Sequence, residues 1–388
     1  MQLFPPTRQE ALNRIAAVQP TEYARSRNAL NGAVTQLSPY ITHGFVSLPE
    51  VLEGVRSRHP VGSQDKLVFE LGWREYYRHV WQHRGDGIFQ SLHDGVLPDA
   101  AYSNEIPLDI LHACTGVAAI DMAVKTLYNT GYLHNHARMW LASYMTHLRK
   151  VHWRAGADWL YGHLLDGDLA SNHLSWQWVA GTGSHKPYLF NSENVARYAP
   201  PAWHSAGSVI DTSYEALDQI ARQVTPVSSS ALMDSQIATP VLLSIPPTSL
   251  GIENPNADTI KGRDVWLVHP WSLGDLPADL PKDRLVIGIY ASEFHRTWPW
   301  HEKRWLFVHS RMAELANACW YGDAASIAAA LQDATRVRGV IEAHIAPWLQ
   351  SLGLQSHSPT LFPEVARRCD SFSKWWHIVS HPLHQEIK

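Results

Sequence analysis

The chain has 388 residues, 45% of them hydrophobic, and a formal net charge of −4, which predicts a globular protein with an ample core and room for two domains. Three cysteines far apart in sequence (Cys114, Cys319 and Cys369) exclude a disulfide framework and a four-cysteine iron–sulfur cluster. No uncharged apolar run approaches bilayer length and the opening MQLFPPTRQEAL lacks a signal-peptide core, so we expect a cytoplasmic protein without a membrane anchor.

The first informative segment is VTQLSPYITHGFVS, residues 34–47. Thr35 and Ser38 place hydroxyl groups and backbone donors ahead of an apolar run. That arrangement suits either the cap of a helix or a diphosphate bound at a helix start, and the sequence leaves both interpretations open.

The next segment, ELGWREYYRHV at residues 70–80, predicts a helix. Glu70, Trp73 and Tyr77 are spaced i, i+3, i+7 and therefore share one face, with Arg74 at its border. An acid beside two flat rings can bind a planar, hydrogen-bonding ligand. The alternative is an ordinary amphipathic helix with a surface pair between Glu70 and Arg74.

Residues 129–178 contain NTGYLHNHARM, LLDGDLASN and WQW, with few β-branched positions. Arg138, Asp166 and Asp168 stand among apolar neighbours, so they should pair with one another or with the polar edge of a cofactor. Asp168 should begin a new helix, which places Asn172 one turn inside it. Taken singly, an Asp-Gly-Asp is most often a turn and a tryptophan is most often part of the core.

Together these motifs resemble the flavin-binding half of the cryptochrome/photolyase superfamily over residues 20–200. The resemblance implies an all-helical domain that binds FAD. It implies that Thr35, Leu37 and Ser38 hold the flavin phosphates, with Arg74 near them. The matched cofactor-binding positions are Tyr23, Thr35, Gln36, Leu37, Ser38, Arg74, Tyr132, Arg138, Asp166, Asp168 and Asn172.

The resemblance also gives roles around the ring system of the cofactor. Tyr132 would lie by the adenine and Asn172 would face the reactive flavin nitrogen. Arg138 and Asp166 would form an ion pair beside the rings, and Asp168 would hydrogen-bond their polar edge.

The implied partner is DNA that contains pyrimidine dimers. Glu70, Trp73, Asn135 and Met139 match positions that contact a flipped-out damaged pyrimidine pair in repair enzymes of the family. Relatives that repair the (6-4) photoproduct carry histidines where this chain has Asn135 and Met139, so the cyclobutane dimer is favoured. The implied reaction is light-driven electron donation from reduced flavin, with Glu70 stabilising the dimer radical anion.

Several positions depart from the family pattern. Trp176 and Trp153 match the inner two of three tryptophans that carry electrons to the flavin, but no tryptophan stands near Ala100, where Tyr102 could substitute. Phe69 replaces a common amide, and His136 replaces a basic residue. These departures keep two alternatives open: a cryptochrome-like photoreceptor without repair activity, and a flavin-binding interaction protein without light chemistry.

Charge gives little support to DNA binding, because residues 1–205 hold equal numbers of basic and acidic side chains. Arg149, Lys150 and Arg154 form a local basic cluster, which is either a DNA contact or a solvated helix face. His134 and His136 form an His-x-His pattern without further metal ligands at suitable spacing, so we expect a structural role and no metal site.

After Trp203 the chain becomes rich in Ser, Pro, Thr and Asn, which predicts a long connection with one short helix at residues 214–223. Short β-branched runs then predict strands at 264–270 and 284–291, and helices are expected at 302–318 and 324–331. The tryptophans of this part are either core or an interface with the first domain. They are Trp298, Trp300, Trp305, Trp375 and Trp376.

We therefore predict a mainly α protein in three parts: a helical FAD-binding domain at 1–204, a linker at 205–262, and a smaller α/β, Rossmann-like domain at 263–388. In the superfamily an α/β antenna domain precedes the flavin domain, so its resemblance to the last part indicates a circular permutation. An unrelated α/β accessory domain is the alternative. The antenna chromophore and any protein partner are unknown.

Overall fold

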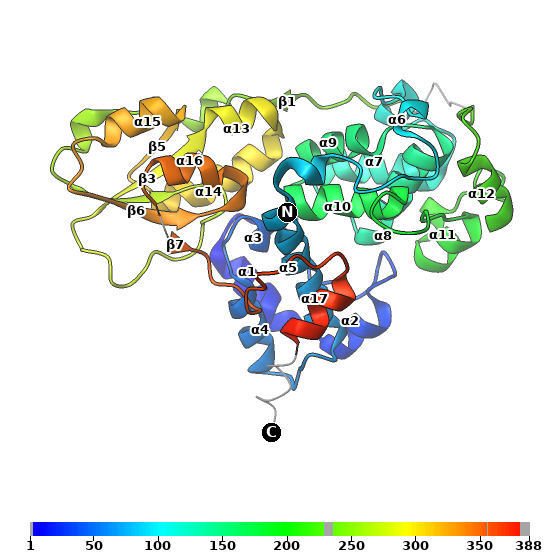
Figure 1. The fold of residues 1–388 in the computed structure, drawn as a ribbon, viewed down its shortest axis with the longest axis horizontal. Helices are drawn as coiled ribbons and strands as arrows, with labels where there is room; N and C mark the ends of the chain where they lie inside the picture. The colour runs from blue at the N-terminus through cyan, green and yellow to red at the C-terminus, as the bar shows by residue number, and fades with distance from the viewer. Residues whose placement is uncertain (1–2, 229–235, 355, 381–388) are drawn as a thin grey trace. The chain divides into compact units, whose positions relative to one another are not determined.

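The computed structural model describes residues 3–228, 236–354 and 356–380. The chain divides into two compact units (Figure 1). Unit 1 joins residues 1–18, 35–60 and 241–363, and unit 2 joins residues 19–34, 61–240 and 364–388. The division differs from the predicted domains: residues 3–18 and 35–60 lie in unit 1 with the α/β part, and residues 364–380 lie in unit 2 with the helical part.

Unit 2 is helical among its described residues, as expected. Its longest helix, α5, runs over Lys66–Arg84 and packs against α10 and α2. The α-helices of the unit are α2 (Pro20–Ser26), α5, α6 (Leu108–Leu111), α7 (Ala118–Thr130), α8 (Asn135–Ser143), α9 (Trp153–His163), α10 (Leu169–Ala180), α11 (Ser192–Tyr198), α12 (Tyr214–Ala221) and α17 (Phe372–Val379). A π-helical turn at Tyr144–Leu148 extends α8. Short 3-10 turns lie at Gly85–Phe89, Asp99–Ala101 and Pro201–Trp203.

Gly131 sets the path of the chain where α7 ends. Its φ of 69° is left-handed, which glycine adopts without a steric penalty. The carbonyl of Gly131 accepts a hydrogen bond from the amide of Leu165 at 2.8 Å. A Cβ at residue 131 would lie 2.7 Å from Cγ of Leu165. This close approach holds the loop between α9 and α10, which carries Asp166 and Asp168.

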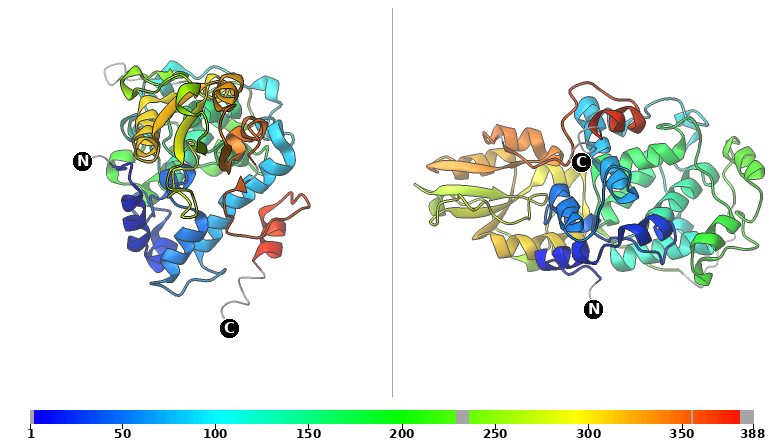
Figure 2. Two further views of the ribbon diagram at one scale, coloured as in Figure 1. Left: turned by 90° about the vertical axis from the view of Figure 1, so that its left-hand side faces the viewer. Right: turned by 90° about the horizontal axis from the view of Figure 1, so that it is seen from below.

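Unit 1 contains a five-stranded parallel sheet with the order β5-β3-β2-β6-β7. Counted along the chain, the strands follow the order 3-2-1-4-5, which is the doubly wound arrangement of a Rossmann-like sheet. Helices lie on both sides of the sheet in the right-hand view of Figure 2. The strands are β2 (Asp264–Val268), β3 (Leu285–Ala291), β5 (Ala318–Gly322), β6 (Arg336–Ile341) and β7 (Ser356–His357). The predicted α/β layer is confirmed.

The helices that accompany the sheet agree with the sequence patterns. The helix expected at 324–331 is α15 (Ala324–Leu331), and the one expected at 302–318 is α14 (Glu302–Leu315). Shorter helices α13 (Ser292–Thr297) and α16 (Ala346–Ser351) complete the unit, together with an antiparallel pair of β1 (Leu242–Leu243) and β4 (Trp300–His301). Trp300 and Trp305 are fully buried in this unit, so the core interpretation is confirmed for them.

The sheet order reverses between β2 and β6, where doubly wound sheets commonly bind ligands at the carboxyl ends of their strands. Here the rings of Trp271 and His344, which follow those two strands, stack with centroids 4.6 Å apart and 11° between planes. His269 Nε2 donates to the carbonyl of Val340 at 2.8 Å beside them. The protein's own aromatic rings therefore occupy this end of the sheet.

The amino-terminal helices of unit 1 were expected in the helical domain. They are α1 (Arg8–Ala17), α3 (Ser38–Thr42) and α4 (Leu48–Arg56). Arg8 bridges Glu50 of α4 and Asp275, with N–O distances of 2.6 and 2.7 Å. His43 Nδ1 donates to the carbonyl of Pro270 at 2.6 Å. These long-range contacts, rather than position in sequence, decide which unit the helices join.

The end of the described chain returns to unit 2 instead of completing the α/β unit. Helix α17 packs against α5 and brings three aromatic side chains to it. Phe372 stacks on Trp73 with centroids 4.1 Å apart and 8° between planes, and the ring of Trp376 lies against Gly72. Trp375 is buried in this cluster. Because Gly72 lacks a Cβ, it leaves the room that this approach requires.

The long predicted linker, residues 205–262, contains the short helix that the sequence indicated. It is α12, Tyr214–Ala221, which contacts the π-helical turn of unit 2. The segment VSSSALMDS of the linker falls largely on residues 229–235, outside the described residues. The order of the two folds along the chain is as expected, and the circular permutation stays a prediction.

Candidate functional site

The loop between α9 and α10 gathers the charged groups that the sequence singled out. Arg138 of α8 donates from Nη2 to both carboxylate oxygens of Asp166, at 2.9 and 2.7 Å. Its Nε also donates to the carbonyl of Leu133 at 2.9 Å, which fixes the guanidinium at the start of α8. Asp166 is buried, and a buried carboxylate is stable only with such a partner. The expected ion pair is present.

Asp168 has two partners. As expected it caps α10, because its Oδ1 accepts from the amide of Ser171 at 2.8 Å. Its Oδ2 accepts from Nη2 of Arg78 on α5 at 2.7 Å, and only 1% of its side chain is exposed. The sequence reading missed Arg78. The sequence could have indicated a second cation, because two buried carboxylates need more positive charge than Arg138 alone provides.

Asn172 lies one turn into α10, as predicted, and it is buried. Its side-chain Nδ2 donates to the carbonyl of Ala157 in α9 at 2.8 Å. The neighbouring His173 bonds through its ring to the carbonyl of Leu169 and to Asp158. These bonds fix α10 against α9, so the amide of Asn172 has a defined direction. Its role beside a flavin stays a prediction.

The predicted shared face of α5 exists. Trp73 and Tyr77 are in ring contact at 5.5 Å, and Glu70 lies 3.5 Å from Nε of Arg27. Burial raises the pKa of Glu70 above its ordinary value, while Arg27 opposes the rise. Burial also raises the pKa of Tyr77 to about 12. The cation beside Glu70 is therefore Arg27, at the end of α2, and the sequence did not predict this pair.

Tyr23 of α2 belongs to the same group of side chains. Burial is the main cause that raises the pKa of its phenol, and the charge of Glu70 adds to it. Trp73 gives one face of its indole to Phe372, a contact that the sequence did not predict. The contact of Trp73 with a nucleic-acid base stays a prediction.

The other expected substrate contacts lie at the start of α8. Asn135 is exposed, and its Nδ2 donates to Sδ of Met139 one turn later at 3.4 Å. His134 donates from Nε2 to the carbonyl of Arg27 and accepts at Nδ1 from the amide of His136. Burial lowers the pKa of His134 to about 4. These bonds give His134 a structural role. Within the described ranges, no group of three or more His, Cys, Asp or Glu could hold a metal.

The expected phosphate-binding segment belongs to unit 1. Leu37 is the N-cap of α3 and no side chain caps it, so helix capping by Thr35 or Ser38 is wrong. Thr35 Oγ1 instead accepts from the amide of Leu37 at 3.4 Å. Gln36 has a left-handed φ of 51°, and Nη1 of Arg14 donates to its Oε1 at 2.8 Å. The phosphate interpretation stays a prediction.

Tyr132 and Arg74 complete the expected cofactor set. The guanidinium of Arg138 lies 5.6 Å from the ring centroid of Tyr132, so Tyr132 borders the Arg138–Asp166 pair. Arg74 is half-buried on α5. Their places beside adenine and phosphate stay predictions.

The two tryptophans of the expected electron path come from adjacent helices. Trp176 of α10 and Trp153 of α9 are both buried, and the ring of Trp176 lies against Gly156, one turn after Trp153. A Cβ at Gly156 would lie 2.3 Å from that ring. Tyr102 contacts the ring of His152 at 6.2 Å, and His152 contacts Trp153 at 5.7 Å. Helix packing thus places both tryptophans in the core of unit 2, and their role as an electron path stays a prediction.

The side chains of the basic cluster at 149–154 have partners within the protein, and a contact with DNA stays a prediction. Lys150 is buried and its Nζ donates to the carbonyls of His147, Ile220 and Ala221. Burial lowers its pKa to about 8. Arg149 makes a bidentate pair with Asp109, and Arg154 pairs with Asp158. The partners of Arg149 and Lys150 are distant in sequence, so the sequence pattern could not show them, whereas Arg154 pairs within its own helix.

Residues 67–213 match the family model described as the FAD binding domain of DNA photolyase. This segment belongs to the photolyase/cryptochrome superfamily. It contains α5 and the Arg138, Asp166, Asp168 and Asn172 positions.

Curated relatives include a deoxyribodipyrimidine photo-lyase of Streptomyces griseus, 36% identical over 42% of this chain and 36% of that protein. A cryptochrome DASH of Idiomarina loihiensis is 28% identical over 46% of this chain and 42% of its own length. The chain thus spans less than half the length of these relatives. A solved cryptochrome of Synechocystis has a TM-score of 0.47 at 22% identity, covering 60% of this chain and 55% of that one.

The photolyase-family segment carries a donor set that fits FAD. An isoalloxazine presents an N–H donor and carbonyl acceptors along one edge. Here two buried carboxylates of one loop, Asp166 and Asp168, pair with guanidinium groups from two helices, Arg138 of α8 and Arg78 of α5. Asp166 and Asp168 can accept from the N–H, while Arg138 can donate to a carbonyl. FAD is therefore the cofactor of this domain. No helix of the described residues is long and apolar enough to span a membrane.

Proposed function

We propose that this protein is a blue-light-driven DNA photolyase that splits cyclobutane pyrimidine dimers. One observation carries the proposal: Glu70 is half-buried beside Arg27 and next to Trp73, on a helix of the FAD-binding segment. A carboxyl group held at this position can form a hydrogen bond to a pyrimidine carbonyl, and burial raises its pKa above the ordinary value. The deoxyribodipyrimidine photo-lyase relatives support this choice of substrate.

In the proposed reaction, bound FAD supplies the light-absorbing electron donor. The dimer accepts one electron, the two bonds that close its cyclobutane ring break, and the electron returns, so the cycle has no net oxidation. Glu70 stabilises the negative charge on the dimer by hydrogen bonding. Arg27 stabilises the ionised form of the Glu70 carboxylate. Trp73, Asn135 and Met139 contact the flipped-out bases.

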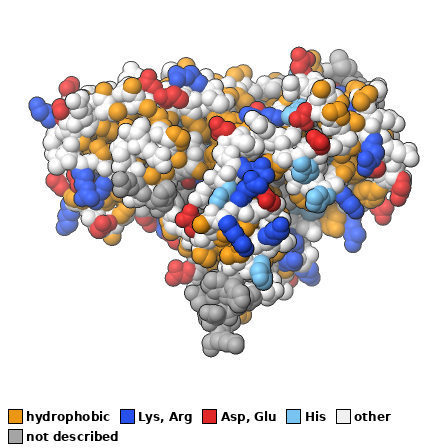
Figure 3. All heavy atoms as spheres, in the orientation of Figure 1, with side chains coloured by type: hydrophobic (Ala, Val, Ile, Leu, Met, Phe, Trp, Pro, Cys, Tyr) orange, Lys and Arg blue, Asp and Glu red, His pale blue; other side chains and the backbone are white. Residues whose placement is uncertain are grey.

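Local positive charge supports a DNA partner despite the neutral balance of residues 1–205. Figure 3 shows Lys, Arg and His side chains gathered on the visible face of unit 2. Helix α5 contributes Arg74, His83 and Arg84, all half-buried. Contacts of such groups with phosphates give DNA affinity that falls steeply with salt.

A cryptochrome-like photoreceptor without repair activity is the second candidate. It is favoured by the cryptochrome DASH relatives and by Phe69. The ring of Phe69 packs on Phe372 and Trp376, at 4.7 and 5.3 Å, where repair enzymes often carry an amide. In that case light would alter a partner surface and no lesion would be split.

The test illuminates the purified protein, with its flavin reduced, in the presence of single-stranded and duplex oligonucleotides that carry one cyclobutane dimer. Repair should restore the two pyrimidines. Glu70→Gln should lower the repair yield about tenfold or more with FAD still bound, while Glu75→Gln, on the same helix, should leave it unchanged.

No restoration on either oligonucleotide would remove the repair function. Continued photoreduction that Trp176→Phe abolishes would then support the photoreceptor. Absence of both light responses would leave a flavin-binding interaction protein. Loss of FAD from Glu70→Gln would contradict the substrate-facing role of Glu70.

A further inference from the structure

We propose that Trp153 is the outermost tryptophan of the electron path and that, once oxidised, it releases its indole proton through Ser91 to Asp99. The inference rests on the proposed light-driven chemistry and assigns a role to Ser91 and Asp99, which had none in that chemistry. It answers how the path ends without a third tryptophan.

A continuous hydrogen-bond chain leads from the buried indole to a carboxylate at the surface. Trp153, with 2% of its surface exposed, donates from Nε1 to Oγ of Ser91 at 3.0 Å. The hydroxyl of Ser91 donates to Asp99, whose oxygens lie 3.1 and 3.0 Å away. The Asp99 side chain is 54% exposed. Each donor thus faces an acceptor, in the order that a proton relay requires.

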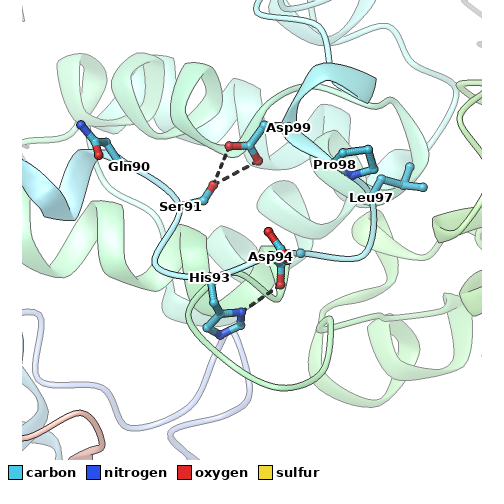
Figure 4. Close-up of a pocket in the computed structure, with 8 residues that line it drawn as sticks. Gln90, Ser91, His93, Asp94, Leu97, Pro98 and Asp99 are labelled. Carbon is cyan, nitrogen blue, oxygen red and sulfur yellow. Dashed lines mark hydrogen bonds between the residues drawn. The ribbon is translucent and has the colours of Figure 1, made fainter.

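The relay opens into a cavity. Ser91 and Asp99 line a pocket of about 540 Å³ formed by residues of the segment 90–99. Figure 4 shows the two side chains facing each other. That volume is ample for water, which needs polar partners such as these to be ordered. A proton delivered to Asp99 therefore has a route to solvent, whereas the indole itself has no direct one.

Electrostatics gives the reason for the proton transfer. When Trp153 gives an electron inward to oxidised Trp176, its indole becomes a cation in a site that excludes water. A buried charge without a counterion is costly, and an oxidised indole is a far stronger acid than a neutral one. Loss of the Nε1 proton removes the charge and leaves a neutral radical, which cannot readily recover the electron.

The proton transfer proceeds in two linked steps. The Nε1–H bond of Trp153 breaks as Ser91 Oγ takes that proton, and Ser91 passes its own hydroxyl proton to Asp99. The products are a neutral Trp153 radical and a protonated Asp99. A soluble thiol then returns one electron to Trp153, which recovers a proton from Asp99 through Ser91.

Tyr102 is the alternative end of the path. Its ring reaches that of His152, which in turn reaches Trp153, so a tyrosine radical would require an additional transfer. His152 Nε2 lies 3.6 Å from Oδ1 of Asp99 and so also borders the proton acceptor. The direct hydrogen bond of the indole nonetheless belongs to Ser91.

The first test follows the light-induced radicals of the full FAD-loaded protein by transient absorption and paramagnetic resonance, which distinguish cationic, neutral and tyrosyl radicals. Ser91→Ala and Asp99→Asn should slow the conversion of the cationic to the neutral tryptophan radical by about tenfold or more, and charge recombination should increase. Asp94→Asn, the same substitution in the same pocket, should change neither.

The second test needs no flavin. In the apoprotein labelled with ¹⁵N-tryptophan, the Nε1–H signal of Trp153 is the one that Trp153→Phe removes. Ser91→Ala should shift this signal and speed its exchange with solvent, Asp99→Asn should shift it less, and Asp94→Asn should leave it in place. Melting curves of all variants show that the fold is retained.

The outcomes separate the relay from the proposed function. Unchanged radical kinetics in both Ser91→Ala and Asp99→Asn, or an indole signal insensitive to Ser91→Ala, would overturn the relay while the light reaction stands. A tyrosyl radical that Tyr102→Phe removes would overturn Trp153 as the outermost donor. Absence of any tryptophan radical in the unaltered protein would overturn both the photochemistry and the relay.

Discussion

The ion pair between Arg78 and Asp168 makes a quantitative prediction. Asp168 begins α10, is 1% exposed and lies 2.7 Å from Nη2 of Arg78, whose side chain is 27% exposed. Arg78→Met keeps most of the apolar stem of the side chain and removes the cation. Asp168→Asn keeps an N-cap of equal quality and removes the anion. The two substitutions should therefore differ strongly in their effect on stability.

Removing one partner of a buried ion pair commonly costs 3 to 5 kcal/mol. Because Arg78 is partly exposed and Asp168 retains its cap to Ser171, we expect about 3 kcal/mol for Arg78→Met, at the lower end of that range. Asp168→Asn leaves the guanidinium of Arg78 without its anion, but this side chain can turn towards water. We therefore expect the free energy of unfolding to fall by only about 1 kcal/mol. In the double variant the stranded carboxylate is gone, and the coupling energy should be about 2 kcal/mol.

Urea unfolding of the apoprotein, followed by tryptophan fluorescence, measures these free energies. For a unit of this size the change in Arg78→Met corresponds to a Tm lower by about 6 to 12 °C. The reasoning would be refuted if Arg78→Met lowered the free energy of unfolding by less than about 1 kcal/mol, or if Asp168→Asn lowered it by more than Arg78→Met does. FAD content measured on the same samples should fall in Asp168→Asn beyond its small loss of stability, because the predicted acceptor for the flavin edge is lost.

Three further predictions concern positions that shape unit 2. Gly131→Ala introduces a Cβ 2.7 Å from Leu165 at a φ of 69°, so the free energy of unfolding should fall by about 2 kcal/mol and FAD content with it; an unchanged melting curve would contradict this. Burial lowers the pKa of His134 from 6.5 to about 4, so its neutral form stabilises the fold above pH 6.5, and this stability is lost as the pH falls from 6.5 towards 4. His134→Gln should remove up to about 3 kcal/mol of that pH dependence, measured by urea unfolding at several pH values. Phe372→Ala removes the ring stacked on Trp73 and should cost about 3 kcal/mol, and an indole fluorescence spectrum unchanged by this substitution would argue against the contact.

Much of the fold could be predicted because it depends on local pattern. The strands β2 and β3, the helices α14 and α15, and the start of α10 at Asp168 follow from alternating or helical apolar spacing and from turn residues. The division into units could not be predicted in this way. Arg8 and His43 attach their helices to residues more than 200 positions away, and no local signal encodes such partners.

In the candidate site, too, the sequence predicted the residues but not their pairing. The motifs fixed which residues carry charge, and the burial of Asp166 and Asp168 among apolar neighbours followed from sequence alone. Which partner each cation has did not follow: Arg27 pairs with Glu70, Arg78 pairs with Asp168, and Lys150 donates to buried carbonyls.

The amino-acid sequence by itself determined the family of the flavin-binding segment, its helical character and the α/β character of the later part, because motif spacing and apolar periodicity are properties of neighbouring residues. Only the tertiary structure decided that Phe372 covers Trp73 and that Ser91 links Trp153 to Asp99. Such contacts join segments that are distant in the chain. They arise from the packing of whole helices, whose angles and offsets depend on many side chains at once.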